Sequence, residues 1–396
     1  MRNGRPFVCS FVPPHILRNI AEKGDAVQRD LAHAALEIAD QVRAERRVVA
    51  SFISALSLSP GGKRRTVYDA LHAKTLPGNL IRGESDRPTK DDAANEAFDG
   101  SGITYDFYKK ILGRDSIDGR GMRLDSSVHF SKDYNNAQWN GKQMIYGDGD
   151  GKIFGRFTKS LDVIGHELTH GVTQHTAGLD YHDQSGALNE HFSDVFGILV
   201  KQYSLGLTAD QSDWLVAAGL FTPAINGKAI RSMKAPGTAY DDKLLGKDPQ
   251  PSHMKDYKKQ QADAGGVHVN SGIPNHTFYL VATAIGGKAW EVAGKIWYET
   301  LTKKLKHDAQ FQQCADATHK VAVEHYGATS IAAKAVADAW SQVGLTITAA
   351  TPKLPVRRRA VATPKATPAP APQKIDVPAA GAELPIAGAP RKTKRT

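Results

Sequence analysis

The sequence predicts an α+β protein in which a strand-rich part precedes a mainly helical part. From Thr66 to about Ile153, short runs of β-branched and aromatic residues alternate with turns rich in Gly, Asp and Asn. From Leu161 to about Leu345, apolar residues instead recur at the three- and four-residue steps of helices. The 396 residues are 41% apolar and 23% charged, which is typical of a soluble globular protein with a large core.

The N-terminal part of the chain, residues 1–50, is predicted to form a separate helical segment. Its apolar residues follow helical spacing from Ile16 to about Arg46, and Gly24-Asp25 divides the run into two helices. Pro13-Pro14 is expected to hold residues 11–17 extended. Because so short a segment cannot bury its own apolar face, we expect it to pack on the rest of the chain.

Residues 51–160 are predicted to form the strand-rich lobe. A helix is expected from Asp92 to Leu112, and Gly147–Gly151 is expected to form a tight turn rather than a calcium loop. The strand candidates share β-branched and aromatic content: Thr66–Tyr68, Leu80-Ile81, Ser127–Phe130, Gln143–Tyr146 and Ile153-Phe154.

Residues 161–347 are predicted to form a helical lobe, and residues 348–396 a disordered tail. From Pro352 onwards the tail holds nine of the twenty prolines and no aromatic residue, too little to offset the entropy of ordering it. The tail also carries +8 of the net charge of +10. The folded part is therefore near neutral, and no specific nucleic-acid partner is expected.

Several classes of protein are excluded by simple counts. No run approaches the roughly 18 apolar residues that span a bilayer, so no transmembrane segment is expected. Two cysteines, Cys9 and Cys314, exclude a disulfide scaffold and a cysteine-cage metal site. The short apolar run before Pro13 is not a secretory signal, so synthesis in the cytoplasm is expected.

The segment His166-Glu167-Leu168-Thr169-His170 carries the strongest chemical signal. Positions i and i+4 share a helix face, so the two imidazoles can bind one metal ion. Glu167 is turned roughly 100° away and can serve as a base beside the metal. The same pattern also arises by chance, and a helical histidine pair without a third ligand is usually a solvated or a core pair.

A third ligand follows at Glu190. Glu190 and Asp194 lie one helical turn apart, on a helix that Leu188, Phe192 and Val195 make look packed. Glu190 fits the third position of a three-ligand zinc site. Asp194 fits a carboxylate that orients a ligating imidazole. A solvated helix face is the ordinary alternative for such an acidic pair.

These motifs resemble the thermolysin family of zinc endopeptidases, and the resemblance covers roughly residues 60 to 345. Nineteen residues separate His170 from Glu190, as in that family. The matching motifs occur in the family's order: Asn135–Gly141, His166–His170, Ala177–Tyr181, Ser185–Asp194, Arg231–Met233 and Asp263–Gly272. The resemblance implies a β-rich and a helical lobe, joined by the zinc-binding helix, with a cleft between them.

The resemblance also implies the role of each catalytic group. One zinc ion would be bound by His166, His170 and Glu190, and Glu167 would take the proton of the attacking water. Tyr181 and His268 would hydrogen-bond the oxyanion, and Asp263 would orient His268 and favour its imidazolium form.

Substrate binding follows from the same resemblance. Arg231 would hold a substrate carbonyl, and Asn136 and Ala137 would hold the peptide backbone extended. Val163 and Ile230 would line an apolar pocket for the residue after the scissile bond. Cleavage of polypeptide substrates before Leu, Ile, Val or Phe is therefore expected.

Three departures from the family pattern have consequences. Gln138 replaces the usual aromatic residue and would make one side of the cleft more polar, and Ala264 replaces an Asn beside His268. Asp162 and Asp213 match calcium ligands of the family's double site, but its other acidic positions correspond to Lys201, Leu215 and Ala218. Calcium binding at that site is expected to be weak or absent, because an ammonium and apolar groups cannot ligate it.

Residues 1–50 resemble the short propeptide of the protealysin-like branch. An autoprocessed zymogen is therefore expected, with this segment as an intramolecular partner of a monomer. Cys9 could block zinc through its thiolate, although an isolated cysteine is usually inert. Many family members are extracellular, so secretion by a signal-independent route stays open. A permanent helical cap is the alternative to a propeptide.

Two other functions compete with an endopeptidase. A zinc exopeptidase would need an anchor for a chain terminus, and no such acidic anchor is found. A catalytically silent peptide-binding homologue would be expected to have lost Glu167 or a zinc ligand, and none is lost.

Overall fold

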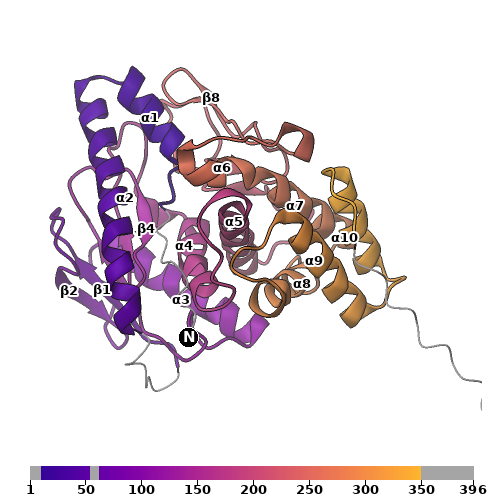
Figure 1. The fold of residues 1–396 in the computed structure, drawn as a ribbon. Coiled ribbons are helices and arrows are strands. Elements are labelled where there is room, and N and C mark those ends of the chain that lie inside the picture. Colours follow the sequence, from indigo (N-terminus) through magenta and orange to yellow (C-terminus); the bar gives the residue numbers. More distant parts are fainter. Residues whose placement is uncertain (1–9, 54–61, 349–396) are drawn as a thin grey trace, which may run out of the picture. The chain divides into compact units, whose positions relative to one another are not determined.

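The computed structural model describes residues 10–53 and 62–348, and side chains are described outside residues 42–53. Among these residues, no helix is long and apolar enough to cross a membrane. The five strands of the main sheet all lie before residue 147, whereas most of the later chain is helical (Figure 1). The observed order agrees with the predicted α+β class.

Two helices open the described chain, as predicted. They are α1 (Pro14–Lys23) and α2 (Ala26–Ile53), and they pack against each other. The prediction that residues 14–17 are extended is wrong, because α1 begins at Pro14. A proline suits the first turn of a helix, since its φ is already helical and no N–H is needed there. Phe11 and Val12 precede α1 and are fully buried.

The main sheet has five strands in the order β2-β1-β3-β5-β4. β1 pairs with β3 and β3 with β5 in parallel, whereas the outer pairs β1–β2 and β4–β5 are antiparallel. β4 is therefore an edge strand with one side open to another extended chain. The strands are β1 (Arg65–Asp69), β2 (Asn79–Gly83), β3 (Leu124–Val128), β4 (Ala137–Trp139) and β5 (Met144–Tyr146).

Two strand predictions were wrong in detail and one strand was missed. β3 ends at Val128, because His129 turns to a φ of 53°. Phe154 makes a single bridge to Phe221 instead of a strand. β4 was not predicted, since three residues with one polar centre give no periodicity to detect.

Helix α3 (Asp92–Leu112) has the predicted bounds. Asp91 caps its N-terminus by accepting a hydrogen bond from the N–H of Ala94, and Gly113 ends it in the left-handed conformation at a φ of 68°. These are the usual start and stop signals of a helix.

Helices α4 (Leu161–Gln174) and α5 (Asp183–Leu205) lie side by side in the interior (Figure 1). α4 contacts α3 and β4, whereas α5 contacts α6 to α9. Both helices are buried on nearly every face, so their polar residues need partners inside the protein.

The remaining elements complete the helical part. Short strand pairs join β6 (Leu215–Val216) to β7 (Arg231–Ser232) and β8 (Asp241–Asp242) to β9 (Gly246–Lys247). The helices are α6 (Ala262–Asn270), α7 (Gly272–Ile285), α8 (Ala293–Glu299), α9 (Phe311–Tyr326) and α10 (Ile331–Gln342). Short 3-10 turns cover Phe157–Lys159 and Met254–Asp256, and a π-helix covers Thr300–Lys304.

Candidate metal centre and peptide-binding edge

Helices α4 and α5 bring His166, His170 and Glu190 together, and all three are buried. The two Nε2 atoms of the imidazoles lie 3.0 Å apart, and each lies 3.6 Å from a carboxylate oxygen of Glu190. Two imidazole nitrogens and one carboxylate are the donor set of a catalytic zinc site with one open position. The residues present therefore fit a zinc ion.

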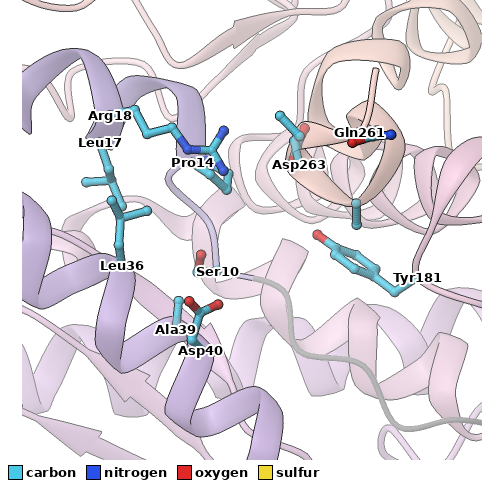
Figure 2. Close-up of a pocket in the computed structure, with 12 residues that line it drawn as sticks. Ser10, Pro14, Leu17, Arg18, Leu36, Ala39, Asp40, Tyr181, Gln261 and Asp263 are labelled. Atoms are coloured by element: carbon cyan, nitrogen blue, oxygen red, sulfur yellow. The ribbon is translucent and has the colours of Figure 1, made fainter. Parts of the chain in front are cut away.

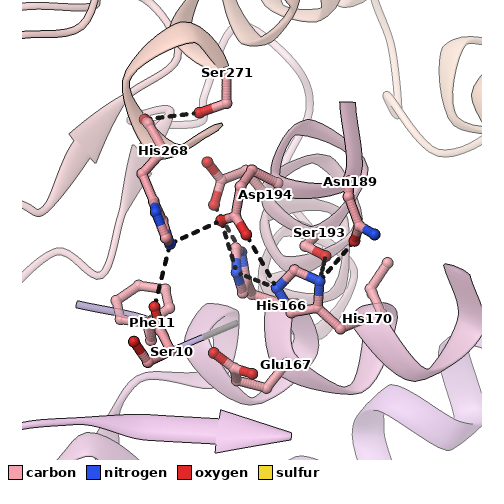
Figure 3. A network of polar contacts seen from close by, with 12 residues as sticks. Ser10, Phe11, His166, Glu167, His170, Asn189, Ser193, Asp194, His268 and Ser271 are labelled. Carbon is pink, nitrogen blue, oxygen red and sulfur yellow. Dashed lines mark hydrogen bonds and ion pairs between the residues drawn. The ribbon is translucent and has the colours of Figure 1, made fainter. Parts of the chain in front are cut away.

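The far side of each imidazole is fixed by a hydrogen bond (Figure 3). Nδ1 of His166 donates to Asp194 Oδ1 at 2.8 Å, and Nδ1 of His170 donates to Asn189 Oδ1 at 2.8 Å. Ser193 Oγ lies 3.0 Å from the same Nδ1 of His170. These bonds aim both Nε2 atoms at Glu190, an arrangement typical of metal-binding histidines. Asn189 and Ser193 lie in the recognised motif, but the sequence did not single them out.

Asp194 joins this cluster to Arg231. The Nε and Nη2 groups of Arg231 each donate to Asp194 at 2.8 Å, and both side chains are buried. Burial alone would raise the pKa of Asp194, but the Arg231 guanidinium and the His166 imidazole outweigh burial and lower it. Asp194 is therefore a fixed negative charge behind His166.

Glu167 contacts β4. Its Oε2 accepts a hydrogen bond from the N–H of Trp139 at 2.8 Å, and the carboxylate is buried. The sequence did not single out this partner, because a backbone donor leaves no mark on residue type. The bond ties the helix that carries the cluster to the edge strand.

His268 and Tyr181 lie on the other side of the cluster. His268 Nδ1 donates to Asp263 Oδ1 at 2.6 Å, and its Nε2 lies 3.5 Å from Glu190 Oε2 and 3.3 Å from the Tyr181 hydroxyl. The Tyr181 hydroxyl also donates to Glu190. Although burial disfavours the charged imidazole, Asp263 and Glu190 raise the pKa of His268.

The sequence Asp263-Ala264-Gly265-Gly266 explains how Asp263 reaches His268. All four residues have φ between 48° and 89° inside α6. Two glycines tolerate this left-handed turn, which would strain longer residues. The turn lets the Asp263 carboxylate accept both the Nδ1 proton and the backbone N–H of His268, the latter at 2.9 Å.

Residues 10–12 of the chain itself lie along β4. Figure 3 shows Ser10 and Phe11 beside His268 and His166. The N–H of Phe11 donates to the carbonyl of Ala137 at 2.9 Å, and the N–H of Val12 donates to Asn136 Oδ1 at 2.8 Å. This segment therefore contacts the open edge of β4 through one backbone bond and one side-chain bond, as a bound peptide can.

Two cationic or potentially cationic groups reach the carbonyls of this segment. His268 Nε2 donates to the carbonyl of Ser10 at 3.2 Å, and Arg231 Nη1 donates to the carbonyl of Phe11 at 3.4 Å. The Phe11 ring packs edge-on against the His166 imidazole at 5.2 Å between centroids, with the Arg231 guanidinium 4.8 Å from the ring. Val163 and Ile230 are buried in the same hydrophobic cluster as Phe11.

A cavity of about 260 Å³ lies beside Ser10, between the helices α1 and α2 and the turn at Asp263 (Figure 2). Figure 2 shows Arg18 and Asp40 on the side of the helical segment and Tyr181 on the opposite side. The lining is mixed, and it joins the N-terminal segment to the residues around His268.

Gln138 is the centre of β4 and is fully buried. Because side chains alternate along a strand, Gln138 lies on the same face as Asn136, the face opposite Trp139. Neither polar atom of its amide has a hydrogen-bond partner among the described residues. Gln138, which was predicted to make one side of the cleft more polar, is therefore buried in the structure.

A second charged cluster occupies the other ends of α4 and α5. Lys201 Nζ lies 3.2 Å from Asp162 Oδ2 and 3.2 Å from Asp213 Oδ1, and it donates to the carbonyl of Leu215 at 2.8 Å. Although burial disfavours the ammonium, Asp162 and Asp213 outweigh burial and raise the pKa of Lys201. Lys201 therefore pairs with both carboxylates.

Two other histidines near the ligands in sequence, His191 and His182, have ordinary structural surroundings. His191 is buried between Asn275 and Trp297, and burial lowers its pKa to about 4. His182 is exposed beside Asp183. The thiolate hypothesis for Cys9 lies outside the described residues, and Cys314 is a buried free thiol.

A buried pair of helical histidines with a glutamate, flanked by an imidazole–carboxylate pair and an open sheet edge, defines a metal-dependent peptidase type of site. Two family models match the chain: "Thermolysin metallopeptidase, catalytic domain" over residues 55–174 and "Thermolysin metallopeptidase, alpha-helical domain" over residues 177–345. The chain belongs to the thermolysin metallopeptidase family.

Individual relatives agree. The chain is 48% identical over 347 residues to an "Extracellular metalloprotease" of Pectobacterium carotovorum subsp. carotovorum, covering 86% of this chain and 97% of that one. It is 39% identical over 287 residues to a "Thermolysin" of Alicyclobacillus acidocaldarius, covering 70% of this chain and 50% of that one. The solved structure "Precursor of Protealysin, Metalloproteinase from Serratia proteamaculans" matches with a TM-score of 0.78 and 50% identity, covering 85% of this chain and 100% of that one. The fold is thus thermolysin-like.

Proposed function

We propose that the chain is a zinc-dependent endopeptidase, made as a zymogen, that cleaves polypeptides before bulky apolar residues. One observation carries this proposal. The protein's own residues 10–12 lie along β4, with the Ser10 carbonyl at His268 and the Phe11 ring against His166. An edge strand beside a metal-type donor set is a peptide-binding cleft with hydrolytic chemistry at one point.

The metal would be held by His166, His170 and Glu190, and Asp194 would keep the His166 ring in its binding orientation. A bound zinc ion supplies a Lewis acid and lowers the pKa of water. Glu167 lies on the same helix and would accept the proton of the attacking water. Its hydrogen bond from Trp139 would keep it oriented toward the cleft.

The oxyanion would be stabilised by His268 and Tyr181. His268 already donates to a peptide carbonyl, that of Ser10, and Asp263 supports its protonated form. A charged donor aimed at a developing oxyanion strengthens as charge builds up there. The Tyr181 hydroxyl lies within reach of His268 and would add a second donor.

Substrate orientation would come from Arg231, Asn136 and Ala137, the three residues that hold Phe11 and Val12 here. Arg231 is itself fixed by its paired hydrogen bonds to Asp194. Val163 and Ile230 would line the pocket for the side chain after the scissile bond. A buried phenylalanine at this position supports a preference for Leu, Ile, Val or Phe.

The zymogen proposal rests on occlusion of this cleft by the N-terminal segment. Beyond residues 10–12, α1 adds hydrogen bonds from Asn19 to the carbonyl of Leu245 and between His15 and the Tyr240 hydroxyl. We propose that residues 1–50 form a removable propeptide, followed by catalytic lobes at 51–160 and 161–347 and a tail at 348–396. α2 continues to Ile53, so the link to the first lobe begins as a helix.

Calcium would contribute little at the position of the family's double site. The carboxylates of Asp162 and Asp213 are already paired with the Lys201 ammonium, which occupies the place a cation would need. A cofactor set of one zinc ion and no tight calcium follows.

We propose secretion of the active form, because similar proteins are named as extracellular. Polypeptides and the propeptide are the proposed partners, and a monomer is the proposed state. A zinc exopeptidase and a silent peptide-binding homologue are the competing functions. The intact Glu167, His268 and ligand set disfavours the silent homologue. The exopeptidase is disfavoured because residues 10–12, which lie along the edge strand, are not a chain terminus.

The proposed function is tested with the purified mature chain and a denatured protein substrate. Fragmentation that stops with a chelator and returns with zinc is expected, and new N-termini should be Leu, Ile, Val or Phe. Release of single residues from chain ends would support the exopeptidase instead. Peptide binding without any cleavage would support the silent homologue.

A further inference from the structure

The contacts of residues 10–12 define which peptide bond faces the catalytic groups. Phe11 lies opposite Ala137 and Val12 next to Asn136, so the segment runs antiparallel to β4. His268 contacts the carbonyl of Ser10, whereas Arg231 contacts the carbonyl of Phe11. The oxyanion donor of the proposed mechanism is thus aimed at the bond between Ser10 and Phe11.

From this register we infer that the Ser10–Phe11 bond is a self-cleavage site, which the zymogen hydrolyses in its own cleft. The inference rests on the proposed endopeptidase function and deepens it. The segment would then be the enzyme's first substrate, not only an inhibitor of the cleft.

The reaction is an ordinary hydrolysis. The oxygen of one water adds to the Ser10 carbonyl carbon, and Glu167 takes a proton from that water. The C–N bond to Phe11 then breaks, and the proton passes from Glu167 to the departing nitrogen. The second proton of the water also ends on that nitrogen, so the products are the carboxylate of Ser10 and the ammonium group of Phe11, and no other reactant is needed.

Side chains on both sides of this bond suit cleavage. Phe11 is fully buried and apolar, as proposed for the residue after a scissile bond, and Ser10 is small. The cavity of about 260 Å³ beside Ser10 has a mixed lining that includes the polar groups of Tyr181 and Asp263. Such a cavity is roomy enough for water close to the Ser10 carbonyl.

The two prolines prevent cleavage at the following bonds. A shift by one residue would put Pro13 at Asn136, and a shift by two would put it at Ala137. Both positions accept a backbone N–H from the bound chain, and proline has none. The register with Phe11 at Ala137 therefore keeps both hydrogen bonds, and it presents the Ser10–Phe11 bond.

Cleavage here would not by itself release the propeptide. The helix α1 stays attached through the buried side chains of Ile16, Leu17 and Ile20 and through Asn19. Processing would thus have two steps: loss of residues 1–10 in the proenzyme's own cleft, then removal of residues 11 to about 50.

The experiment follows the N-terminus of the full-length chain after purification with zinc. Intact mass and N-terminal sequencing should show Phe11 as the first residue of wild type, or of the propeptide that it releases. The Glu167→Gln protein should keep residues 1–10. Because the bond sits in its own cleft, the rate of this cut should not change on dilution.

Substitutions at Phe11 provide matched controls. Phe11→Leu should be cut at the same bond, and Phe11→Asp should not, because an acidic residue does not fit the apolar site. Val27→Asp, an equally polar change on an exposed residue of α2, should be cut like wild type. In the Glu167→Gln background, Phe11→Asp should also increase binding of a fluorescent peptide with a central Leu, a readout that needs no turnover.

The outcomes separate the inference from the proposed function. A wild-type proenzyme that keeps residues 1–10, while its mature form digests proteins, overturns the inference alone. So does a released propeptide that begins anywhere other than Phe11, or a cut at Phe11 in the Glu167→Gln protein alone in solution. If wild type hydrolyses no peptide at all, the inference and the endopeptidase function both fail.

Discussion

The helices α4 and α5 carry two charged clusters, and the buried carboxylates of the two clusters are neutralised in different ways. In the first cluster, the imidazoles of His166 and His170 and the carboxylate of Glu190 lie close together, and none of the three is a lysine or an arginine. Around Asp162 and Asp213, the carboxylates converge on the ammonium of Lys201. A buried carboxylate is costly unless it is paired, so each cluster needs a cation, and the two obtain it from different sources.

The comparison shows that the residue type facing a buried carboxylate decides what the site can do. An internal lysine pairs with both carboxylates. The histidine cluster instead has its Nδ1 atoms fixed by Asp194 and Asn189, so the two Nε2 atoms lie close to each other and to Glu190. The first arrangement stabilises the fold, whereas the second suits a reactive ion.

The largest expected effect is the loss of peptide hydrolysis in a variant that keeps all three proposed zinc ligands. Glu167→Gln should reduce peptide hydrolysis to a trace, since an amide cannot accept the proton of water. About one zinc per chain should remain, because the three ligands are intact. Activity against a fluorogenic peptide and metal content are measured together. Substantial residual turnover would remove Glu167 from the role of base.

The next effect concerns the oxyanion donor. His268→Ala should lower kcat by roughly 10²–10³ with little change in KM or zinc content, because its hydrogen bond matters most in the transition state. Since Asp263 raises the pKa of His268, wild-type kcat should fall as pH rises through that raised pKa. This limb of the pH profile should be absent in His268→Ala, and an unchanged kcat in the variant would contradict the assignment.

The free energy of unfolding tests the role of Lys201 in the second cluster. Lys201→Met should destabilise the protein by about 3 kcal/mol, because it leaves the buried Asp162 without its cation. Asp213 is partly exposed and can move toward solvent. The loss of stability should therefore lie at the low end of the range for removing one partner of a buried ion pair. Urea unfolding of the inactive Glu167→Gln protein avoids self-digestion. A change below about 0.5 kcal/mol would show that Lys201 is not the compensating charge.

Calcium provides the matching test of the same cluster. Millimolar calcium should raise the melting temperature of the Glu167→Gln protein by less than about 2 °C, since a ligand stabilises only what it binds. A rise of about 10 °C would show that a calcium site exists despite Lys201.

The smallest expected effect concerns His129, whose positive charge is lost at high pH. His129 lies between Asp148 and Asp91, at 2.9 Å and 2.8 Å, and the hydrogen bond to Asp148 raises its pKa to about 9 against the opposing effect of burial. Its stabilisation should be complete below the ordinary pKa of about 6.5 and lost as pH rises through about 9. His129→Asn should cost about 1 kcal/mol or less at pH 6, because solvent screens these charges. An equal cost at pH 10 would contradict this reading.

The sequence predicted the parts of the fold and site that depend on periodic pattern and residue chemistry. Helix α3 and the ligand spacing are of this kind, because spacing on a helix determines which face a side chain occupies. β4 was missed, although it builds the cleft edge, since three residues carry no periodic signal. The bond from the backbone of Trp139 to Glu167 was missed because backbone donors are the same in every residue.

The N-terminal segment shows the same limit. Its prolines predicted that residues 11–17 are extended, but Phe11 and Val12 lie in a bend and the helix begins at Pro14. Which residue meets Ala137 depends on contacts across more than a hundred residues of sequence, such as that from Val12 to Asn136. Such a register requires the folded structure.

The most direct test of a metal-dependent endopeptidase is a cleavage-site map of a denatured protein digested by the mature chain. Products are identified by mass spectrometry, with and without a chelator and with zinc restored. The account predicts internal cuts before Leu, Ile, Val and Phe that vanish with the chelator and return with zinc. Cuts that persist without metal, or that release only terminal residues, would contradict it.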